Sequence, residues 1–333
     1  MGYVVGVDGG GTKTTAAVVR DDGVALGTDR AGPANSRSVG TESAGRNIAV
    51  AIAAALASAH IALKDVDCIV MCCAGFDTDL DLEVPRTAMQ SLGYKGPVIA
   101  ENDVVGAWAG ATGGEPGVVM ISGTGATGMG MNEKREFWRT DGWDTLLGDD
   151  GSGYNIGHLA IRAAMRALDG RGPRTALVTA MEKAFGAKTA QDMRRMWDSG
   201  HAGKFEIADF AIAVEEVAKQ GDAIATEILS NAGQALLNSA AAIVRELDLA
   251  HVAFPLCTVG STINRNEPVR SIFLGGIHTI APGALIRDML HSPEMGAALL
   301  GFQRLKEDDL GSWTLGTGKR VIRRSHTAEE VAG

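Results

Sequence analysis

Two short stretches of the sequence combine glycine with residues that bind phosphate. Residues 8–14 read DGGGTKT, and residues 123–125 read GTG after an apolar run. Glycine lets the backbone turn tightly, and the N–H groups of such turns can face phosphate oxygens. The donors expected around a phosphate are Gly9, Gly10, Gly11, Thr12, Lys13 and Thr14 in the first turn and Gly123, Thr124 and Gly125 in the second. Asp8, at the end of a strand, is placed to hold Mg²⁺ through water.

Neither stretch fits a better-known nucleotide motif. Gly123, Gly125 and Gly128 have the G-x-G-x-x-G spacing of a dinucleotide fingerprint, but that fingerprint must open a helix. Residues 129–134 alternate and then turn, so no helix is expected there. A P-loop needs Gly directly before Lys, whereas Thr12 precedes Lys13. Two facing phosphate turns remain the preferred interpretation, and two unrelated tight hairpins remain the alternative.

A carboxylate follows the apolar run in VIAENDVVGAW, residues 98–108. The strand ends in Asn102-Asp103 and a helix begins at once. Asp103 is expected either to cap this helix or to act as a general base at the tip of the strand. The two roles are compatible.

A Gly/Asp loop spans residues 141–157, DGWDTLLGDDGSGYNIG. Its carboxylates, from Asp141, Asp144, Asp149 and Asp150, could accept hydrogen bonds from sugar hydroxyls, and Trp143 could cover an apolar ring face. Alternatively, Asp149 and Asp150 could cap a helix that starts near Ser152. The order of residues that defines a calcium loop is absent.

The elements that must position these residues alternate between strands and helices. Segments 3–20 and 117–132 both read as strand, Gly/Thr turn and strand, which predicts two duplicated α/β halves that face a cleft, with a break near residues 113–117. The expected helices are 42–63, 82–92, 104–111, 156–168, 175–185, 207–219, 223–247, 269–279 and 296–305, and the further strands are 68–72, 97–100 and 253–259. The segment after about Lys306 reads as a surface tail.

Composition narrows the class of protein. The 333 residues carry a net charge of −9, which argues against nucleic acid or an anionic membrane as a partner. The most apolar stretch, 48–63, is too short to span a bilayer, and no signal-peptide pattern opens the chain. Cys68, Cys72, Cys73 and Cys257 show no zinc or disulfide spacing and are expected to be reduced and buried. A cytoplasmic location follows from these features.

Taken in order, six stretches of the chain resemble those of one family. They are GVDGGGTKT, ISGTGATG, GDDGSGYNIG, DGRGPRTAL, PLCTVGSTIN and SPEMGAALL. The set is similar to the BadF/BadG/BcrA/BcrD-type ATPases of the actin-like sugar kinase and heat-shock ATPase superfamily, and within them to N-acetylglucosamine and glucosamine kinases. The resemblance implies an α/β fold of two actin-like (ribonuclease H-like) domains flanking an ATP/sugar cleft. Residues 1–114, joined by helix 294–305, would form the first domain, 115–293 the adenosine-side domain, and 306–333 a tail.

The resemblance also implies roles for individual residues. Asp103 would be the catalytic base, and Asp8 would hold Mg²⁺. ATP would be bound by Gly10, Gly11, Thr12, Lys13, Thr14, Gly123, Thr124, Gly125, Gly260 and Ser261. The amino sugar would be bound by Asn35, Asp103, Ala126, Thr127, Gly142, Trp143, Asp144 and Asp149. The implied protein is a homodimeric kinase that phosphorylates the sugar, at its 6-hydroxyl.

Two other functions remain open at this point. The first is an activator ATPase for a 2-hydroxyacyl-CoA dehydratase, which would need exposed cysteines for an iron–sulfur cluster. The second is a sugar-sensing protein without catalysis.

Overall fold

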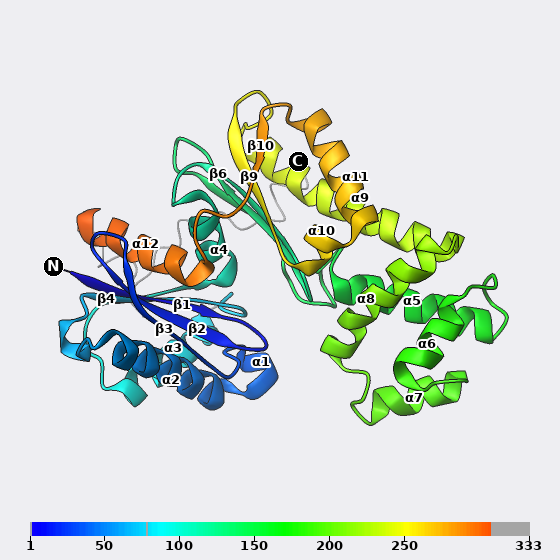
Figure 1. Ribbon diagram of the computed structural model, residues 1–333, viewed down its shortest axis with the longest axis horizontal. Helices are drawn as coiled ribbons and strands as arrows, with labels where there is room; N and C mark the ends of the chain where they lie inside the picture. The colour runs from blue at the N-terminus through cyan, green and yellow to red at the C-terminus, as the bar shows by residue number, and fades with distance from the viewer. Residues whose placement is uncertain (1, 78, 308–333) are drawn as a thin grey trace. The chain divides into compact units, whose positions relative to one another are not determined.

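The chain forms two compact units, each with its own five-stranded sheet (Figure 1). The computed structural model describes residues 2–77 and 79–307. The first unit contains the described residues up to Val119 and those from Asp288 onward. The second contains Met120–Arg287.

The first sheet is mixed, in the order β3-β2-β1-β4-β5. Its strands are β1 (Tyr3–Gly9), β2 (Thr14–Arg20), β3 (Ala25–Ala31), β4 (Cys68–Cys73) and β5 (Val98–Asn102). β1 pairs antiparallel with β2 and parallel with β4. The helices of this unit are α1 (Ser36–Val39), α2 (Thr41–Ala59), α3 (Glu83–Leu92), α4 (Asp103–Thr112) and α12 (Pro293–Glu307), with short turns η1 (Leu63–Asp65) and η2 (Asp79–Leu82).

Successive side chains of β1 point to opposite faces of the sheet, as in any strand. Val5 and Val7 face α2, where they join a core that includes Ile48 and Ile52. Figure 1 shows α2 and α3 on this face and α4 and α12 on the other. Gly6 faces the second pair of helices. Asp8, two residues further along, must point to that same side.

Glycine allows α4 and α12 to approach the sheet and each other at backbone distance. A Cβ atom on Gly6 would lie 2.0 Å from the Glu294 carbonyl oxygen of α12. A Cβ on Gly296 would lie 2.2 Å from both the Gly106 carbonyl oxygen and the Gly110 nitrogen of α4. The first turn of α12 and the start of α4 are therefore held against the carboxyl-terminal half of β1.

The second sheet, in the order β10-β9-β6-β7-β8, repeats the strand order of the first when read from its other end. Its strands are β6 (Gly117–Ser122), β7 (Ala126–Met131), β8 (Phe137–Asp141), β9 (Phe254–Val259) and β10 (Ala284–Arg287). Its helices are α5 (Gly153–Leu168), α6 (Leu177–Phe185), α7 (Ala190–Asp198), α8 (Lys204–Lys219), α9 (Ala223–Glu246), α10 (Ser261–Arg265) and α11 (Glu267–Ile280).

The expected α/β class and the order of the expected strands and helices are confirmed, with ends that differ by a few residues. Six of the described helices and strands were missed. They are α1, α7, α10 and the strands β3, β8 and β10. The residues of β3 and β10 lack a β-branched alternation. The segment after Gly128 is strand β7, as expected, and not a helix. The tail expected from about Lys306 lies almost wholly outside the described residues.

Gly128 itself has a packing role. A Cβ there would lie 2.6 Å from the Met120 sulfur and 2.8 Å from Ile243 Cδ1 of α9. The glycine spacing in this stretch thus combines a turn with a tight helix contact.

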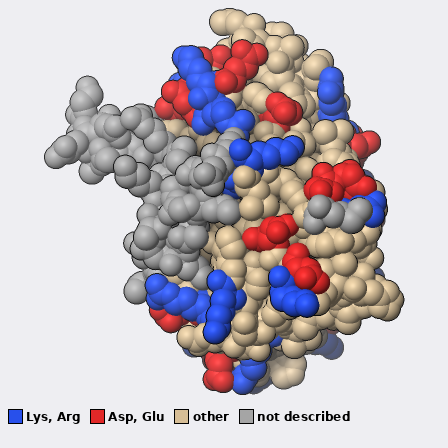
Figure 2. All heavy atoms as spheres, turned by 90° about the vertical axis from the view of Figure 1, so that its left-hand side faces the viewer, with Lys and Arg blue, Asp and Glu red and all other residues tan. Residues whose placement is uncertain are grey.

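The surface carries charges of both signs. Figure 2 shows Lys/Arg and Asp/Glu interspersed on one face of the molecule. In the first unit, ion pairs link Arg20 with Asp22 and Arg46 with Glu42. Among the described helices, none is both long enough and apolar enough to cross a bilayer.

Alanine substitutions at two helical glycines measure how much the α4–α12 contact contributes to the free energy of unfolding. Gly296→Ala should lower the free energy of unfolding by about 1–3 kcal/mol, because the added methyl group meets backbone that cannot move aside. Gly275→Ala in α11 is the matched control, since its Cβ would meet nothing within 4 Å. It should stabilise the protein by about 0.5–1 kcal/mol. Urea unfolding of both variants measures this, and equal effects would contradict the close packing.

Candidate functional site

The first glycine turn connects β1 to β2 and is closed by its own backbone. The Gly10 N–H donates to the Lys13 carbonyl oxygen (2.9 Å), so this amide is already used within the turn. A Cβ on Gly9 would lie 2.4 Å from Cys73 Sγ, which explains a glycine at this position. Thr12 and Lys13 are exposed at the tip. In this turn, Thr12 and Lys13 at the exposed tip are therefore better placed to contact a phosphate than the Gly10 N–H.

Thr14 differs from its expected role as a phosphate donor. Its side chain is fully buried in β2, and its hydroxyl donates to the Gly32 carbonyl oxygen (2.7 Å). Its position in β2 turns the side chain into the protein, so its hydroxyl is already used within the first unit. Thr14 stabilises the end of the turn.

Three carboxylates gather on the α4/α12 face of the first sheet. Asp8 lies on β1, Asp103 opens α4, and Glu294 lies in the first turn of α12. Burial, followed by the negative charges of Asp103 and Glu294, raises the pKa of Asp8 to about 7, and the positive charge of Lys13 opposes this rise. Such a cluster of partly uncompensated negative charge favours a bound proton or cation.

Asn102, and not Asp103, caps α4. The Asn102 side-chain oxygen accepts from the Val104 N–H (3.2 Å), and Asp103 is the first helical residue. The capping role expected for Asp103 is therefore wrong by one position. Half-buried in the first turn, the Asp103 carboxylate lies where the helix dipole favours an anion.

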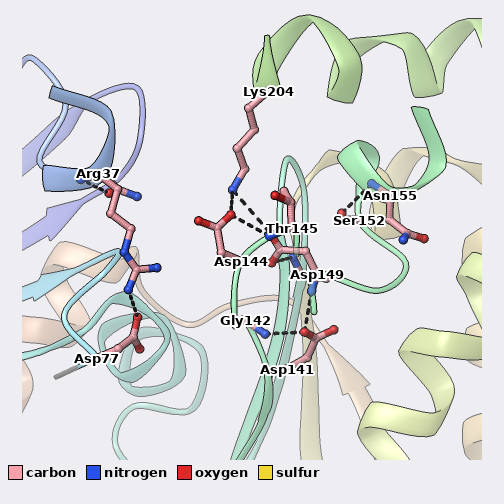
Figure 3. A network of polar contacts seen from close by, with 12 residues as sticks. Arg37, Asp77, Asp141, Gly142, Asp144, Thr145, Asp149, Ser152, Asn155 and Lys204 are labelled. Atoms are coloured by element: carbon pink, nitrogen blue, oxygen red, sulfur yellow. Dashed lines mark hydrogen bonds and ion pairs between the residues drawn. The ribbon is translucent and has the colours of Figure 1, made fainter. Parts of the chain in front are cut away.

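A polar link fixes Asn102 from its other side. Its side-chain N–H donates to Asp77 Oδ1 (3.1 Å), and Asp77 Oδ2 lies 3.8 Å from an Arg37 nitrogen. Figure 3 shows Arg37 and Asp77 approaching one another. Asn35, expected to bind sugar, caps the short helix α1 by accepting from the Arg37 N–H (3.0 Å).

In the second unit, the 123–125 turn meets two other segments. The Gly123 carbonyl oxygen accepts from the Gly153 N–H at the start of α5 (2.7 Å) and from the Thr262 hydroxyl of α10 (3.0 Å). Gly260, with φ of 103°, lies so close that a Cβ would be 2.3 Å from the Ser122 carbonyl oxygen. The structure thus brings together the predicted ATP-binding stretches around Thr124 and Ser261, which are more than a hundred residues apart in sequence.

The loop between β8 and α5 is organised around Asp141. Its carboxylate accepts from the backbone N–H groups of Gly142 (2.7 Å), Asp149 (2.6 Å) and Asp150 (2.8 Å). Asp141, Asp144 and Asp149 all have positive φ values of 58°, 70° and 61°. Aspartate tolerates this conformation better than most residues because it can hydrogen-bond locally. Asp141 is therefore the structural centre of the loop.

Asp149 turns toward the second glycine turn. Its Oδ1 accepts from the Ala126 N–H (3.1 Å), and a Cβ on Gly125 would lie 2.9 Å from that same oxygen. The helix cap expected from Asp149 or Asp150 is wrong, because Ser152 caps α5 by accepting from the Asn155 N–H (3.0 Å). Asp149 and Ala126, two of the predicted sugar-binding residues, are thus in direct contact.

Three further predicted sugar residues, Thr127, Gly142 and Trp143, lie in or beside the same loop. The Thr127 hydroxyl donates to the Thr140 carbonyl oxygen (3.2 Å), and Arg139 donates to the Gly142 carbonyl oxygen (2.8 Å). The Arg139 guanidinium also lies 5.0 Å from the Trp143 ring centre, so a cation–π contact occupies one ring face. Trp143 is 37% exposed.

The arrangement of the acidic, histidine and cysteine side chains bears on direct metal coordination and on an iron–sulfur cluster. In residues 2–77 and 79–307, no group of three or more His, Cys, Asp or Glu side chains is arranged to enclose a metal ion. Cys68, Cys72, Cys73 and Cys257 are buried and unbridged, as expected. Burial raises the pKa of Cys68 to about 12, so that thiol stays protonated. A cysteine-bound iron–sulfur cluster is not favoured.

Sequence reasoning missed several residues that shape these sites. Glu294 lies in SPEMGAALL, a stretch whose carboxylate was not singled out. Lys204 lies outside every motif recognised in the sequence, yet its ammonium forms ion pairs with Asp144 and Asp149 (Figure 3). No local signal could have found Lys204, because it follows Asp144 by 60 positions.

Asp8→Asn tests the electrostatics of the carboxylate cluster. At about pH 8 the wild-type Asp8 is ionised, and burial and its acidic neighbours destabilise that form. At about pH 5, below its pKa of about 7, Asp8 is already neutral. Because Asp8 of the unfolded chain ionises above about pH 4, the variant should raise the Tm of the metal-free protein at both pH values, and by clearly more at the higher one.

Differential scanning fluorimetry with EDTA measures both values. Asp22→Asn is the control, because the Arg20 side chain lowers the pKa of Asp22 and its ionised form is favoured. A gain in Tm for Asp8→Asn that is equal at both pH values would contradict the assignment.

Two known proteins match the chain over most of its length. An N-acetylmuramic acid/N-acetylglucosamine kinase from Clostridium acetobutylicum is 31% identical over 300 residues, which are 90% of this chain and 98% of that protein. An N-acetyl-D-glucosamine kinase from Dictyostelium discoideum is 31% identical over 315 residues, covering 91% of this chain and 98% of that protein.

Solved structures share the fold. A Chromobacterium violaceum protein provisionally named an N-acetylglucosamine kinase has a TM-score of 0.73 at 24% identity, covering 91% of this chain and 99% of its own. A ROK family glucokinase from Streptomyces griseus has a TM-score of 0.52 at 19% identity, covering 90% and 99%. These likenesses identify the fold as that of the actin-like sugar kinases. The BadF/BadG/BcrA/BcrD ATPase family model matches residues 5–301. The chain belongs to the BadF/BadG/BcrA/BcrD ATPase family.

Proposed function

We propose that this protein is an ATP-dependent kinase that transfers a phosphoryl group to a hydroxyl of an amino sugar. The observation that carries the proposal is the carboxylate cluster of Asp8, Asp103 and Glu294 in a chain whose full-length relatives are named amino-sugar kinases. Such a transfer needs one carboxylate to take the proton of the attacking hydroxyl and donors that stabilise the phosphoryl oxygens.

Asp103 is the proposed general base. Its position at the start of α4 is fixed by the neighbouring Asn102 cap and by the Asp77 link to that cap. Because α4 packs against α12 and the sheet, the carboxylate is held by rigid elements rather than by a loop. It would receive the hydroxyl proton as the oxygen bonds to the γ-phosphorus and the bond to the leaving ADP oxygen breaks.

Asp8 and the exposed tip of the first turn form the proposed phosphate side of the first unit. A Mg²⁺ ion held at Asp8 through water would neutralise phosphate charge. The fit rests on the raised pKa of Asp8, since a cation nearby would restore its ionised form. Lys13, which already lowers the pKa of Asp8, would contribute a further positive charge.

The second unit supplies the proposed adenosine and sugar contacts. The proposed ATP contacts are Thr124, Ser261 and the glycines beside them. The hydrogen bond from Thr262 of α10 to Gly123, and the close approach of Gly260 to Ser122, support this grouping. Ala126, Thr127, Gly142, Trp143, Asp144 and Asp149 are proposed to contact the sugar, together with Asn35 of the first unit. The 6-hydroxyl as acceptor, a cytoplasmic location and a homodimeric assembly belong to the same proposal.

An ADP-release assay with Mg·ATP tests the proposal. The panel consists of N-acetylglucosamine, glucosamine, N-acetylmuramic acid and glucose, each with a blank that lacks sugar. ADP formation should depend on an amino sugar. ADP release that is the same with and without every sugar would overturn the kinase assignment.

Asp103→Asn should lower kcat by at least about 100-fold, because a positioned general base contributes on that order. ATP should still bind with an affinity close to that of the wild type, which isothermal titration calorimetry measures. Asp22→Asn, on the surface of the same unit, is the control and should retain full turnover. Near-normal kcat in Asp103→Asn would remove this residue from the role of base.

A further inference from the structure

Lys204 is a cation in an unfavourable local position. It is the first residue of α8, where the helix dipole disfavours a positive charge, and the preceding Gly203 provides no side-chain cap. A residue type that is unfavourable for its local secondary structure is often retained because of a contact with a distant part of the chain. The contacts of Lys204 therefore need an explanation beyond helix formation.

The Lys204 ammonium reaches two carboxylates of the Gly/Asp loop. Its Nζ lies 2.7 Å from Asp144 Oδ1 and 3.5 Å from Asp149 Oδ2. Figure 3 shows the Lys204 side chain extending from α8 toward both acids. The Asp149 side chain is only 7% exposed, so this contact is better shielded from water than an ordinary surface ion pair.

Other groups in the described part of the chain hold the backbone of this loop. Asp141 uses its carboxylate on three backbone N–H groups, and Asp149 Oδ1 accepts from the Ala126 N–H. Asp144 Oδ1 accepts from the Thr145 N–H (2.7 Å). The Lys204 ammonium, by contrast, contacts both carboxylates.

The two acids repel one another. Burial raises the pKa of Asp149, the charge of Asp144 raises it further, and the Ala126 N–H and Lys204 lower it. Asp141, on the same loop, also feels the charge of Asp149. A cation between Asp144 and Asp149 offsets this repulsion and lets both remain ionised at close range.

We propose that Lys204 is a positioning residue for sugar binding, which holds the carboxylates of Asp144 and Asp149 in the arrangement that accepts sugar hydroxyls. The inference rests on the proposed kinase function. Lys204 acts through the two aspartates and takes no part in proton or phosphoryl transfer. Its loss should weaken sugar binding while leaving the transfer step and ATP binding intact.

Steady-state kinetics of three variants test this. Lys204→Met keeps the length of the side chain without its charge and should raise the KM for the sugar about tenfold, as expected for a lost hydrogen bond to a charged group. Its kcat and its KM for ATP should stay within about twofold of the wild type. Lys204→Arg should restore most of the sugar affinity. Lys188→Met, which removes an exposed ion pair with Glu182 (3.6 Å) in the same unit, should change nothing.

The pH profile separates positioning from simple stability. Without the Lys204 charge, the pKa of Asp149 should rise further, since burial and Asp144 then act with less opposition. The acidic limb of kcat/KM for the sugar should move to higher pH in Lys204→Met and stay in place in Lys204→Arg. A limb that does not move, or a rise confined to the KM for ATP, would overturn the inference.

Hydrogen exchange tests the positioning independently of turnover. The Ala126 and Thr145 amides, which donate to Asp149 and Asp144, should exchange faster in Lys204→Met than in the wild type or Lys188→Met. If the wild type phosphorylates no amino sugar, the proposed function fails, and exchange alone decides the role of Lys204. Unchanged exchange at both amides would overturn the positioning role.

Discussion

The packing of α4 and α12 against β1 at backbone distance is the constraint on which the first unit depends. At Gly6 and Gly296 a single methyl group would meet another backbone, and at Gly106 it would meet the Cys72 side chain. This close approach brings the first turns of two helices next to the end of a strand. Asp8, Asp103 and Glu294 consequently share one half-buried region, and burial, followed by the negative charges of Asp103 and Glu294, raises the pKa of Asp8 to about 7. A structure that tolerates such a concentration of negative charge is suited to binding a cation.

In the second unit, the conformation of one loop, and not close helix packing, positions the carboxylates. The loop after β8 has several residues in the left-handed region, and Asp141 satisfies its backbone N–H groups. Asp149 and Lys204 then connect the loop to β7 and to α8. Fixed carboxylates suit the recognition of hydroxyl groups, because the donors and acceptors need not be ordered again on binding.

Much of this could be predicted from the sequence because the signals are local. The apolar run before DGGGTKT predicts a strand, and the glycines predict a turn, so β1 and β2 were expected within residues 3–20. The same reasoning rejected a dinucleotide site at 123–128, since a strand and not a helix follows Gly128. The six ordered stretches also pointed to the correct family.

The sequence could not predict features that depend on contacts between distant residues. It also could not decide which of two adjacent residues takes a given role. Asn102 and Asp103 are both good caps, and only the backbone shows that the first is the cap. Thr14 follows Lys13 directly but points inward, because strand alternation begins there. Glu294 and Lys204 become significant only once α12 lies on β1 and α8 reaches the Gly/Asp loop.

The central claim is that the chain moves a phosphoryl group from ATP to an amino sugar. The most direct measurement is ³¹P NMR of a reaction containing Mg·ATP, N-acetylglucosamine or glucosamine, and the protein. The account predicts a new phosphomonoester signal, coupled to the sugar protons at carbon 6, that grows as the γ-phosphate signal of ATP declines. Release of inorganic phosphate alone, with no sugar phosphate, would contradict it.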